Sequence, residues 1–263
     1  MESEPNPEKT INQFKNSLEI VKSSNIFQAD YINASRFVIF GDQNIIYGEN
    51  NVRPMNDNEF DYHDFTLGVR TDFIALNNYD DYEKFTMENV DDRHFIASYF
   101  LSERPTYEEF IAHEIAHNIF DINYKQRFGE YEIKNGIPEI SDDYRDKIKY
   151  HITELTKKYY PTLAIEKFSF NRQQISEIFA MIYQRQFCEN TGINSNTNTL
   201  VENNVQSFVN DPTGELQKFN SLHNRQCSID DFYSENHILS LIVSNLIDKE
   251  YDDFNNRLAL FWQ

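Results

Sequence analysis

Apolar positions change their spacing along the chain, and each spacing predicts a different kind of element. Over residues 8–23 they recur three or four positions apart, as on one face of a helix; these positions are Ile11, Phe14, Leu18 and Val21. Short aromatic and β-branched runs follow and are typical of strands. These runs cover residues 37–40, 44–47, 73–76 and 95–100. Gly41, Asp42 and Gln43 separate the first two runs and predict a hairpin turn.

From about residue 105 onward the apolar spacing indicates helices. The predicted helices cover residues 106–121, 143–158, 172–188, 213–222, 237–248 and 251–261. A polar stretch rich in Asn and Thr, residues 190–204, predicts a surface loop. Strands followed by helices favour the α+β class. We expect one domain over 1–263, with a helix and a small, mostly antiparallel sheet in 1–104 and a mainly helical part in 105–263.

The charge balance narrows the classes of partner. The chain has 24 Lys and Arg residues against 43 Asp and Glu residues, a formal net charge of −19. Such a surface repels phosphate backbones, so we expect no direct binding of nucleic acid. The charge has two interpretations: it serves solubility, or it attracts a basic substrate protein.

The positions of the cysteines argue against a cysteine zinc site, and the short apolar runs argue against a membrane-spanning helix. Cys188 and Cys227 lie far apart and form no Cys-x-x-Cys pair, which excludes a cysteine zinc site. No run approaches the roughly 18 apolar residues that a membrane-spanning helix needs. The first residues show neither the basic nor the apolar region of a signal peptide. We expect no membrane span, and the oligomeric state stays open.

Candidate chemistry is concentrated in His113-Glu114-Ile115-Ala116-His117. Two histidines four positions apart lie on one face of a helix, where two neutral imidazoles can bind one Zn²⁺. Glu114 lies beside the first histidine, where it can take a proton from zinc-bound water. The sequence Thr106-Tyr107-Glu108-Glu109 predicts a capping box at the start of this helix. The alternative interpretation is a pair of core histidines on an ordinary amphipathic helix.

The segment Ile-Ala-His-Glu-Ile-Ala-His (111–117) resembles the zincin superfamily of metallopeptidases. The resemblance implies an α+β zincin-like fold, and it implies that the strand over 95–100 borders the substrate cleft. A metzincin needs glycine at 120 and histidine at 123, but this chain has Phe120 and Asn123. The peptide deformylase and aspzincin motifs are also absent. The gluzincin arrangement remains, in which a glutamate on a second helix completes the metal site.

Glu177 is the strongest candidate for this third ligand. Asn171 and Gln174 predict a helix start that places Glu177 inside the helix. An unpaired carboxylate among apolar neighbours is costly unless a cation meets it. The thermolysin-like Glu-x-x-x-Asp is missing, because position 181 is Met. A surface glutamate is the alternative interpretation of Glu177, and the competing candidate ligands are Glu154, Asp121 and Asp143.

Zincins usually add a residue that stabilises the oxyanion of the tetrahedral intermediate. Tyr183 is the candidate chosen for this role; the alternatives are His151, Tyr160, His223 and His237.

The sequence thus predicts a zinc metallopeptidase that binds one Zn²⁺ through His113, His117 and Glu177 and uses Glu114 as general base. The expected partner is a protein or peptide substrate, with a basic one favoured by the charge. The resemblance favours a soluble, secreted or effector-type protein over a cytoplasmic one. The alternative is a non-catalytic zincin-like module whose acidic surface captures a basic protein.

Overall fold

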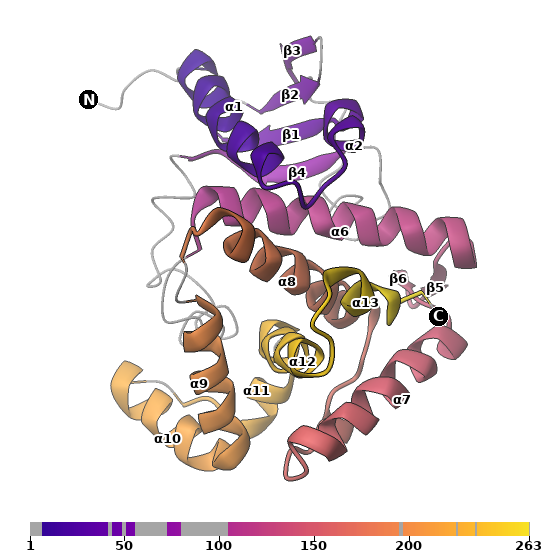
Figure 1. The fold of residues 1–263 in the computed structure, drawn as a ribbon, viewed down its shortest axis with the longest axis vertical. Coiled ribbons are helices and arrows are strands. Elements are labelled where there is room, and N and C mark those ends of the chain that lie inside the picture. Colours follow the sequence, from indigo (N-terminus) through magenta and orange to yellow (C-terminus); the bar gives the residue numbers. More distant parts are fainter. Residues whose placement is uncertain are drawn as a thin grey trace.

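The computed structural model describes residues 7–41, 44–48, 51–55, 73–79, 105–194, 197–224, 226–234 and 236–262. The α+β class is confirmed, with a small sheet in the N-terminal part and helices after it (Figure 1). The N-terminal elements are α1 (Pro7–Ser23), α2 (Ala29–Ala34), β1 (Phe37–Phe40), β2 (Ile45–Gly48), β3 (Asn51–Pro54) and β4 (Ile74–Asn77). The later elements are α6 (Tyr107–Phe128), β5 (Glu132–Lys134), β6 (Ile137–Glu139), α7 (Asp142–Tyr159), the 3₁₀ turn η2 (Ile165–Lys167), α8 (Arg172–Thr191), α9 (Thr197–Asn210), α10 (Pro212–His223), α11 (Ile229–Ser234), α12 (Asn236–Glu250) and α13 (Phe254–Ala259).

The described sheet has the strand order β3-β2-β1-β4. The β1–β2 and β2–β3 pairs are antiparallel, as expected, whereas β1 and β4 are parallel. A short connection allows an antiparallel hairpin, and the long connection from Phe40 to Ile74 allows the parallel crossover. The predicted strands over 37–40, 44–47 and 73–76 are confirmed with shifts of about one residue. The predicted strand over 95–100 lies outside the described residues.

Helix α1 covers the sheet with the apolar face that its spacing predicts. Phe14, Leu18 and Val21 are buried, and Ile11 packs against the same core. The ring centroid of Phe14 lies 5.0 Å from that of Phe37 on β1, and 5.0 Å from that of Tyr47 on β2. The sheet therefore has aromatic packing on the α1 side, which large rings favour.

Helices α6, α8 and α12 form successive layers below the sheet in the view of Figure 1. Helix α6 contacts β4 and packs along α8, and α8 packs along α12 on its other side. Ala112, Ala116 and Ala180 are fully buried, so small side chains let α6 and α8 approach closely. This arrangement places α8 between two helices, and almost every residue in its middle is buried.

The predicted loop over 190–204 is wrong in its second half, because α9 begins at Thr197. Val201, Val205, Phe208 and Val209 are buried and follow a helical spacing that the Asn-rich composition obscured. Helix α6 is also longer than expected and ends at Gly129, where φ is 89°. That backbone conformation suits glycine at a helix end.

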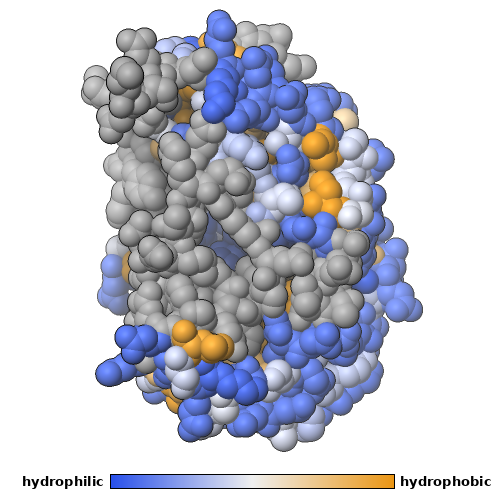
Figure 2. Space-filling view, turned by 90° about the vertical axis from the view of Figure 1, so that its left-hand side faces the viewer, coloured by the Kyte–Doolittle hydropathy of each residue, from blue (hydrophilic) through white to orange (hydrophobic). Residues whose placement is uncertain are grey.

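The face shown in Figure 2 is mostly hydrophilic where it is coloured, and its apolar residues form small separate groups. This agrees with the position of most large apolar side chains in one continuous core. Among the described residues, no helix is long and apolar enough to cross a membrane.

Candidate metal centre

The first half of α6 presents His113 and His117 toward α8. The predicted capping box is present: the Glu109 amide donates to the Thr106 hydroxyl, and the Thr106 amide donates to the Glu109 carboxylate. This cap fixes where the helix begins and therefore which face carries the histidines. Four residues advance a helix by about one turn, so the two imidazoles lie one above the other.

The start of α8 fixes the position of Glu177 in a similar way. The Asn171 side chain accepts a hydrogen bond from the amide of Gln174, as expected for an N-cap. Glu177 follows in the second turn, and it is buried to 9% exposure. The predicted helical position of Glu177 is confirmed.

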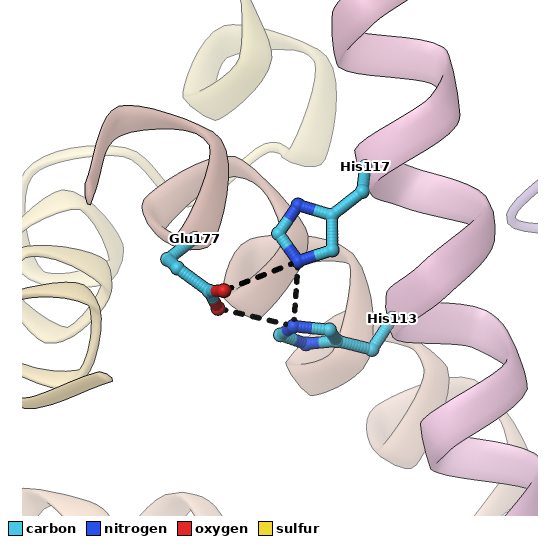
Figure 3. Close-up of side chains that lie close together, drawn as sticks. All are labelled: His113, His117 and Glu177. Carbon is cyan, nitrogen blue, oxygen red and sulfur yellow. Dashed lines mark hydrogen bonds and ion pairs between the residues drawn. The ribbon is translucent and has the colours of Figure 1, made fainter. Parts of the chain in front are cut away.

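The two imidazoles and the Glu177 carboxylate converge on one point, as Figure 3 shows. The Nε2 atoms of His113 and His117 lie 3.0 Å apart. Oε2 of Glu177 lies 3.2 Å from Nε2 of His113, and Oε1 of Glu177 lies 3.4 Å from Nε2 of His117. The three residues could hold a metal ion, since their donor atoms all lie within 4.8 Å of one another.

A polar side chain of α8 holds the other nitrogen of each imidazole. Nδ1 of His113 lies 3.0 Å from Oε1 of Gln184, and Nδ1 of His117 lies 2.7 Å from Oγ of Ser176. An imidazole that donates from Nδ1 has a lone pair on Nε2, the form that binds a metal. Both histidines are therefore held with Nε2 toward Glu177.

Glu177 is ionised despite its burial. Burial by itself raises the pKa of Glu177, but the nearby His237 and His117, with hydrogen bonds from His113 and His117, outweigh it and hold the pKa well below its usual range. Burial opposes a charged imidazole at His117, but the carboxylates of Glu177, Glu114 and Asp121 prevail and raise its pKa. The site therefore combines the negative charge of Glu177 with imidazole nitrogens that can bind a metal ion.

Glu114 lies next to the triad without belonging to it. Burial raises the pKa of Glu114; His117 and His113 oppose that shift, and the charge of Glu177 adds to it. A carboxylate with a raised pKa accepts a proton more readily than an ordinary glutamate does. Glu114 is thus a candidate proton acceptor next to the triad, with a raised pKa and with His113, His117 and Glu177 as electrostatic neighbours.

Tyr183, the residue predicted to stabilise the oxyanion, packs elsewhere on α8. Its ring stacks on Phe27 at 5.2 Å and contacts Phe179 and Phe254. Each residue of a helix is rotated by about 100° from the one before it. Tyr183, six positions after Glu177, therefore lies on a different face, whereas Gln184, seven positions after it, lies on the same face. Within the described part of the chain, no contact links Tyr183 to the triad.

His237, at the start of α12, is the alternative candidate that the structure brings to the site. Its Nε2 lies 3.6 Å from Oε2 of Glu177. Tyr160 instead donates a short hydrogen bond to Asn245, and His151 is exposed on α7 beside Tyr150. Sequence reasoning could not choose among these candidates, because each had a plausible helical context and none had a motif.

The competing acidic ligands lie away from the triad. Asp121 is paired with Arg172, whose Nη2 lies 3.1 and 3.0 Å from the two carboxylate oxygens. Glu154 pairs with Lys157 at the surface of α7, and Asp143 is exposed in the first turn of that helix. Ser176 and Gln184 were not among the predicted site residues. Ser176 directly precedes Glu177, and Gln184 follows it by seven residues. This spacing is the only sequence feature that points to them.

Comparisons of the chain with family models, with curated proteins and with solved structures found no match.

Proposed function

We propose that this chain is a zinc-dependent metallopeptidase in which His113, His117 and Glu177 hold the metal ion. The observation that carries the proposal is the convergence of three electron-pair donors on one point inside the protein. Gln184 and Ser176 can each accept a proton from Nδ1, and this tautomer leaves a lone pair on both Nε2 atoms beside the carboxylate. In this tautomer the three donor atoms repel one another unless a proton or a metal cation lies between them.

The spacing of the donors supports zinc. Bonds of about 2.0–2.2 Å in a tetrahedral site put neighbouring ligand atoms about 3.4 Å apart. The two Nε2 atoms lie 3.0 Å apart, and each has a Glu177 oxygen nearby: Oε2 lies 3.2 Å from His113, and Oε1 lies 3.4 Å from His117. Two imidazoles and a carboxylate also bind iron(II) in oxygenases. Glu114 favours the hydrolytic alternative, because a proton acceptor beside the metal has a clear task only in hydrolysis.

A bound zinc ion with three protein ligands would polarise a substrate carbonyl and bring the pKa of a coordinated water to about 7. Glu114 takes the proton from the attacking water and delivers it to the nitrogen of the leaving amine. Gln184 and Ser176 keep the two imidazoles in one tautomer and orientation. Peptides are the proposed substrates, because the motif helix resembles that of the zincin peptidases.

The test compares Glu114→Gln with Glu154→Gln, an exposed glutamate on α7. Each protein is reconstituted with zinc, its metal content is measured by elemental analysis, and cleavage of a peptide library is followed by mass spectrometry. The wild type and Glu154→Gln should each bind about one equivalent of zinc and cleave peptides. Glu114→Gln should keep its zinc and lose roughly 10²–10⁴-fold in kcat/KM.

A wild-type protein that binds no zinc would refute the proposal, and so would cleavage that a chelator does not affect. Stoichiometric zinc without cleavage of any peptide would support the alternative of a non-catalytic binding module. Stoichiometric iron in protein purified without added metal would instead indicate an oxygenase.

A further inference from the structure

A third helix, α12, places the His237 side chain next to Glu177 of the triad. His237 is the second residue of α12, and its Nε2 lies 3.6 Å from Oε2 of Glu177. The same Oε2 lies 3.2 Å from Nε2 of His113. The Glu177 carboxylate is therefore approached from α6 by two histidines and from α12 by one.

The position of α12 relative to α8 is fixed by a buried ionic network. Arg185 on α8 lies 2.7 Å from the Asp248 carboxylate on α12 and donates to the Ser244 hydroxyl at 3.1 Å. Arg257 pairs with the other oxygen of Asp248 at 3.0 Å. Two helices held together in this way cannot slide or rotate freely. The separation between His237 and Glu177 is consequently set by the packing of α8 against α12.

We propose that His237 is the positioning residue of Glu177, a role that rests on the proposed metal site. The Nε2 atom of His237 lies 3.6 Å from Oε2, an ion-pair contact longer than a hydrogen bond, and its attraction for Oε2 would limit how the carboxylate turns toward a metal ion. Oε1, which faces His117 at 3.4 Å, then serves as the ligand oxygen. Glu177 would then hold the metal ion through one oxygen, which would leave a fourth coordination position for water.

This role completes a regular arrangement around the site. Gln184 positions His113, Ser176 positions His117, and His237 positions Glu177. Each proposed metal ligand thus has one neighbouring side chain that does not itself bind the metal. Such neighbours change metal affinity by about 10–100-fold. A flexible carboxylate needs such a partner more than an imidazole does, because it has more rotatable bonds and two equivalent oxygens.

His237 has a second conceivable task, since its side chain is 28% exposed whereas that of Glu177 is 11% exposed. It could donate to the substrate oxyanion instead of to Glu177. The two roles predict different measurements. A positioning residue changes the affinity and geometry of the bound metal in the absence of substrate, whereas an oxyanion donor changes kcat alone.

The experiment measures metal binding by the full chain without substrate. Three variants are compared with the wild type: His237→Phe, which removes the donor, His237→Gln, which keeps an N–H donor, and His151→Phe, a control at an exposed histidine on α7. Zinc affinity is obtained by competition with a chromogenic chelator. Cobalt(II) replaces zinc for visible absorption spectra, in which four-coordinate sites absorb more strongly than five-coordinate ones.

We expect His237→Phe to weaken zinc binding by about 10–100-fold. We also expect its cobalt bands to lose intensity as both carboxylate oxygens bind. His237→Gln should recover most of the affinity and the spectrum, and His151→Phe should match the wild type. If phenylalanine prevents folding, His237→Ala removes the donor without adding bulk and carries the same expectation.

Zinc affinity of His237→Phe within about twofold of wild type, with an unchanged cobalt spectrum, would overturn the positioning role. Loss of kcat in that variant with unchanged metal binding would assign His237 to the substrate and would also overturn it. Neither result would affect the proposed function. A wild-type chain that binds no metal would instead remove the proposed function and the role of His237 together.

Discussion

Two buried acidic groups lie along the same interface between α6 and α8, and their partners differ in kind. Asp121 lies one helical turn after His117, and both of its carboxylate oxygens contact the Arg172 guanidinium at 3.0–3.1 Å. Tyr131 donates a further short hydrogen bond to Asp121. Glu177 is buried to a similar degree, with side-chain exposures of 11% for Glu177 and 9% for Asp121. Its nearest partners are imidazole nitrogens instead of a permanent cation.

The difference shows which group carries its counter-charge within the chain. An arginine is charged at every ordinary pH, so the Asp121 cluster is complete by itself. The imidazoles around Glu177 can gain or lose a proton, and in the neutral form they can bind a metal ion instead. A buried carboxylate whose partners are only imidazoles could hold a metal ion together with them. Four predictions test this contrast, in order of decreasing expected effect.

The largest effect is expected when the charge of Glu177 is removed. Structural zinc sites are worth about 10–16 kcal/mol, so one of three ligands accounts for about 3–5 kcal/mol. Glu177→Gln should therefore lower zinc affinity by roughly 10²–10⁴-fold, as measured by chelator competition. Asp121→Asn should change that affinity only a few-fold. An equal loss of zinc in both variants would mean that the fold, and not the ligand, controls binding.

For the free energy of unfolding we expect the opposite ranking, with the larger loss in Asp121→Asn. Asp121→Asn leaves Arg172 buried without its counter-charge and should lower the free energy of unfolding by about 3–5 kcal/mol. The measurement is urea unfolding of metal-free protein, with Glu154→Gln as a surface control expected within about 0.5 kcal/mol of wild type. An unchanged urea midpoint for Asp121→Asn would show that the ion pair does not stabilise the fold.

Smaller effects are expected from the residues that hold the imidazoles. Gln184→Ala and Ser176→Ala should each weaken zinc affinity by about 10–100-fold, because His113 or His117 loses its fixed tautomer. Gln186→Ala is the matched control, since the Gln186 amide bonds Asn190 on the exposed side of α8. Unchanged zinc affinity in both site variants would show that the helices alone orient the imidazoles.

The smallest effect concerns the net charge of the chain, in which acidic residues outnumber basic ones by 43 to 24. The basic residues are too few to neutralise all of these carboxylates, which leaves the formal net charge of −19. A basic peptide substrate should therefore have a kcat/KM that falls several-fold between about 20 and 200 mM salt, since salt screens charges over about 10 Å at 0.1 M. A matched acidic peptide should not show this fall. Asp80, Asp81, Asp91 and Asp92, which the sequence suggests as contributors, lie outside the described residues.

Local sequence signals predicted much of the site because the elements that carry it begin at clear caps. Thr106 and Asn171 each start a helix, and the positions of the histidines and of Glu177 follow by counting residues. The prediction was weaker where composition and spacing disagreed. The first half of helix α9 falls within the predicted loop over 190–204, because its polar residues are rich in Asn and Thr. Its four buried apolar positions determine the structure.

The sequence by itself determined that two imidazoles share one helical face with Glu114 beside them, because four residues make about one helical turn. It also determined that Glu177 lies inside a later helix among apolar neighbours. Only the tertiary structure decided that Glu177 meets the histidines, that Asp121 is neutralised by Arg172, and that Ser176, Gln184 and His237 surround the triad. These contacts join residues 51 to 71 positions apart. No local pattern encodes such distances, because they depend on how α6, α8 and α12 pack together.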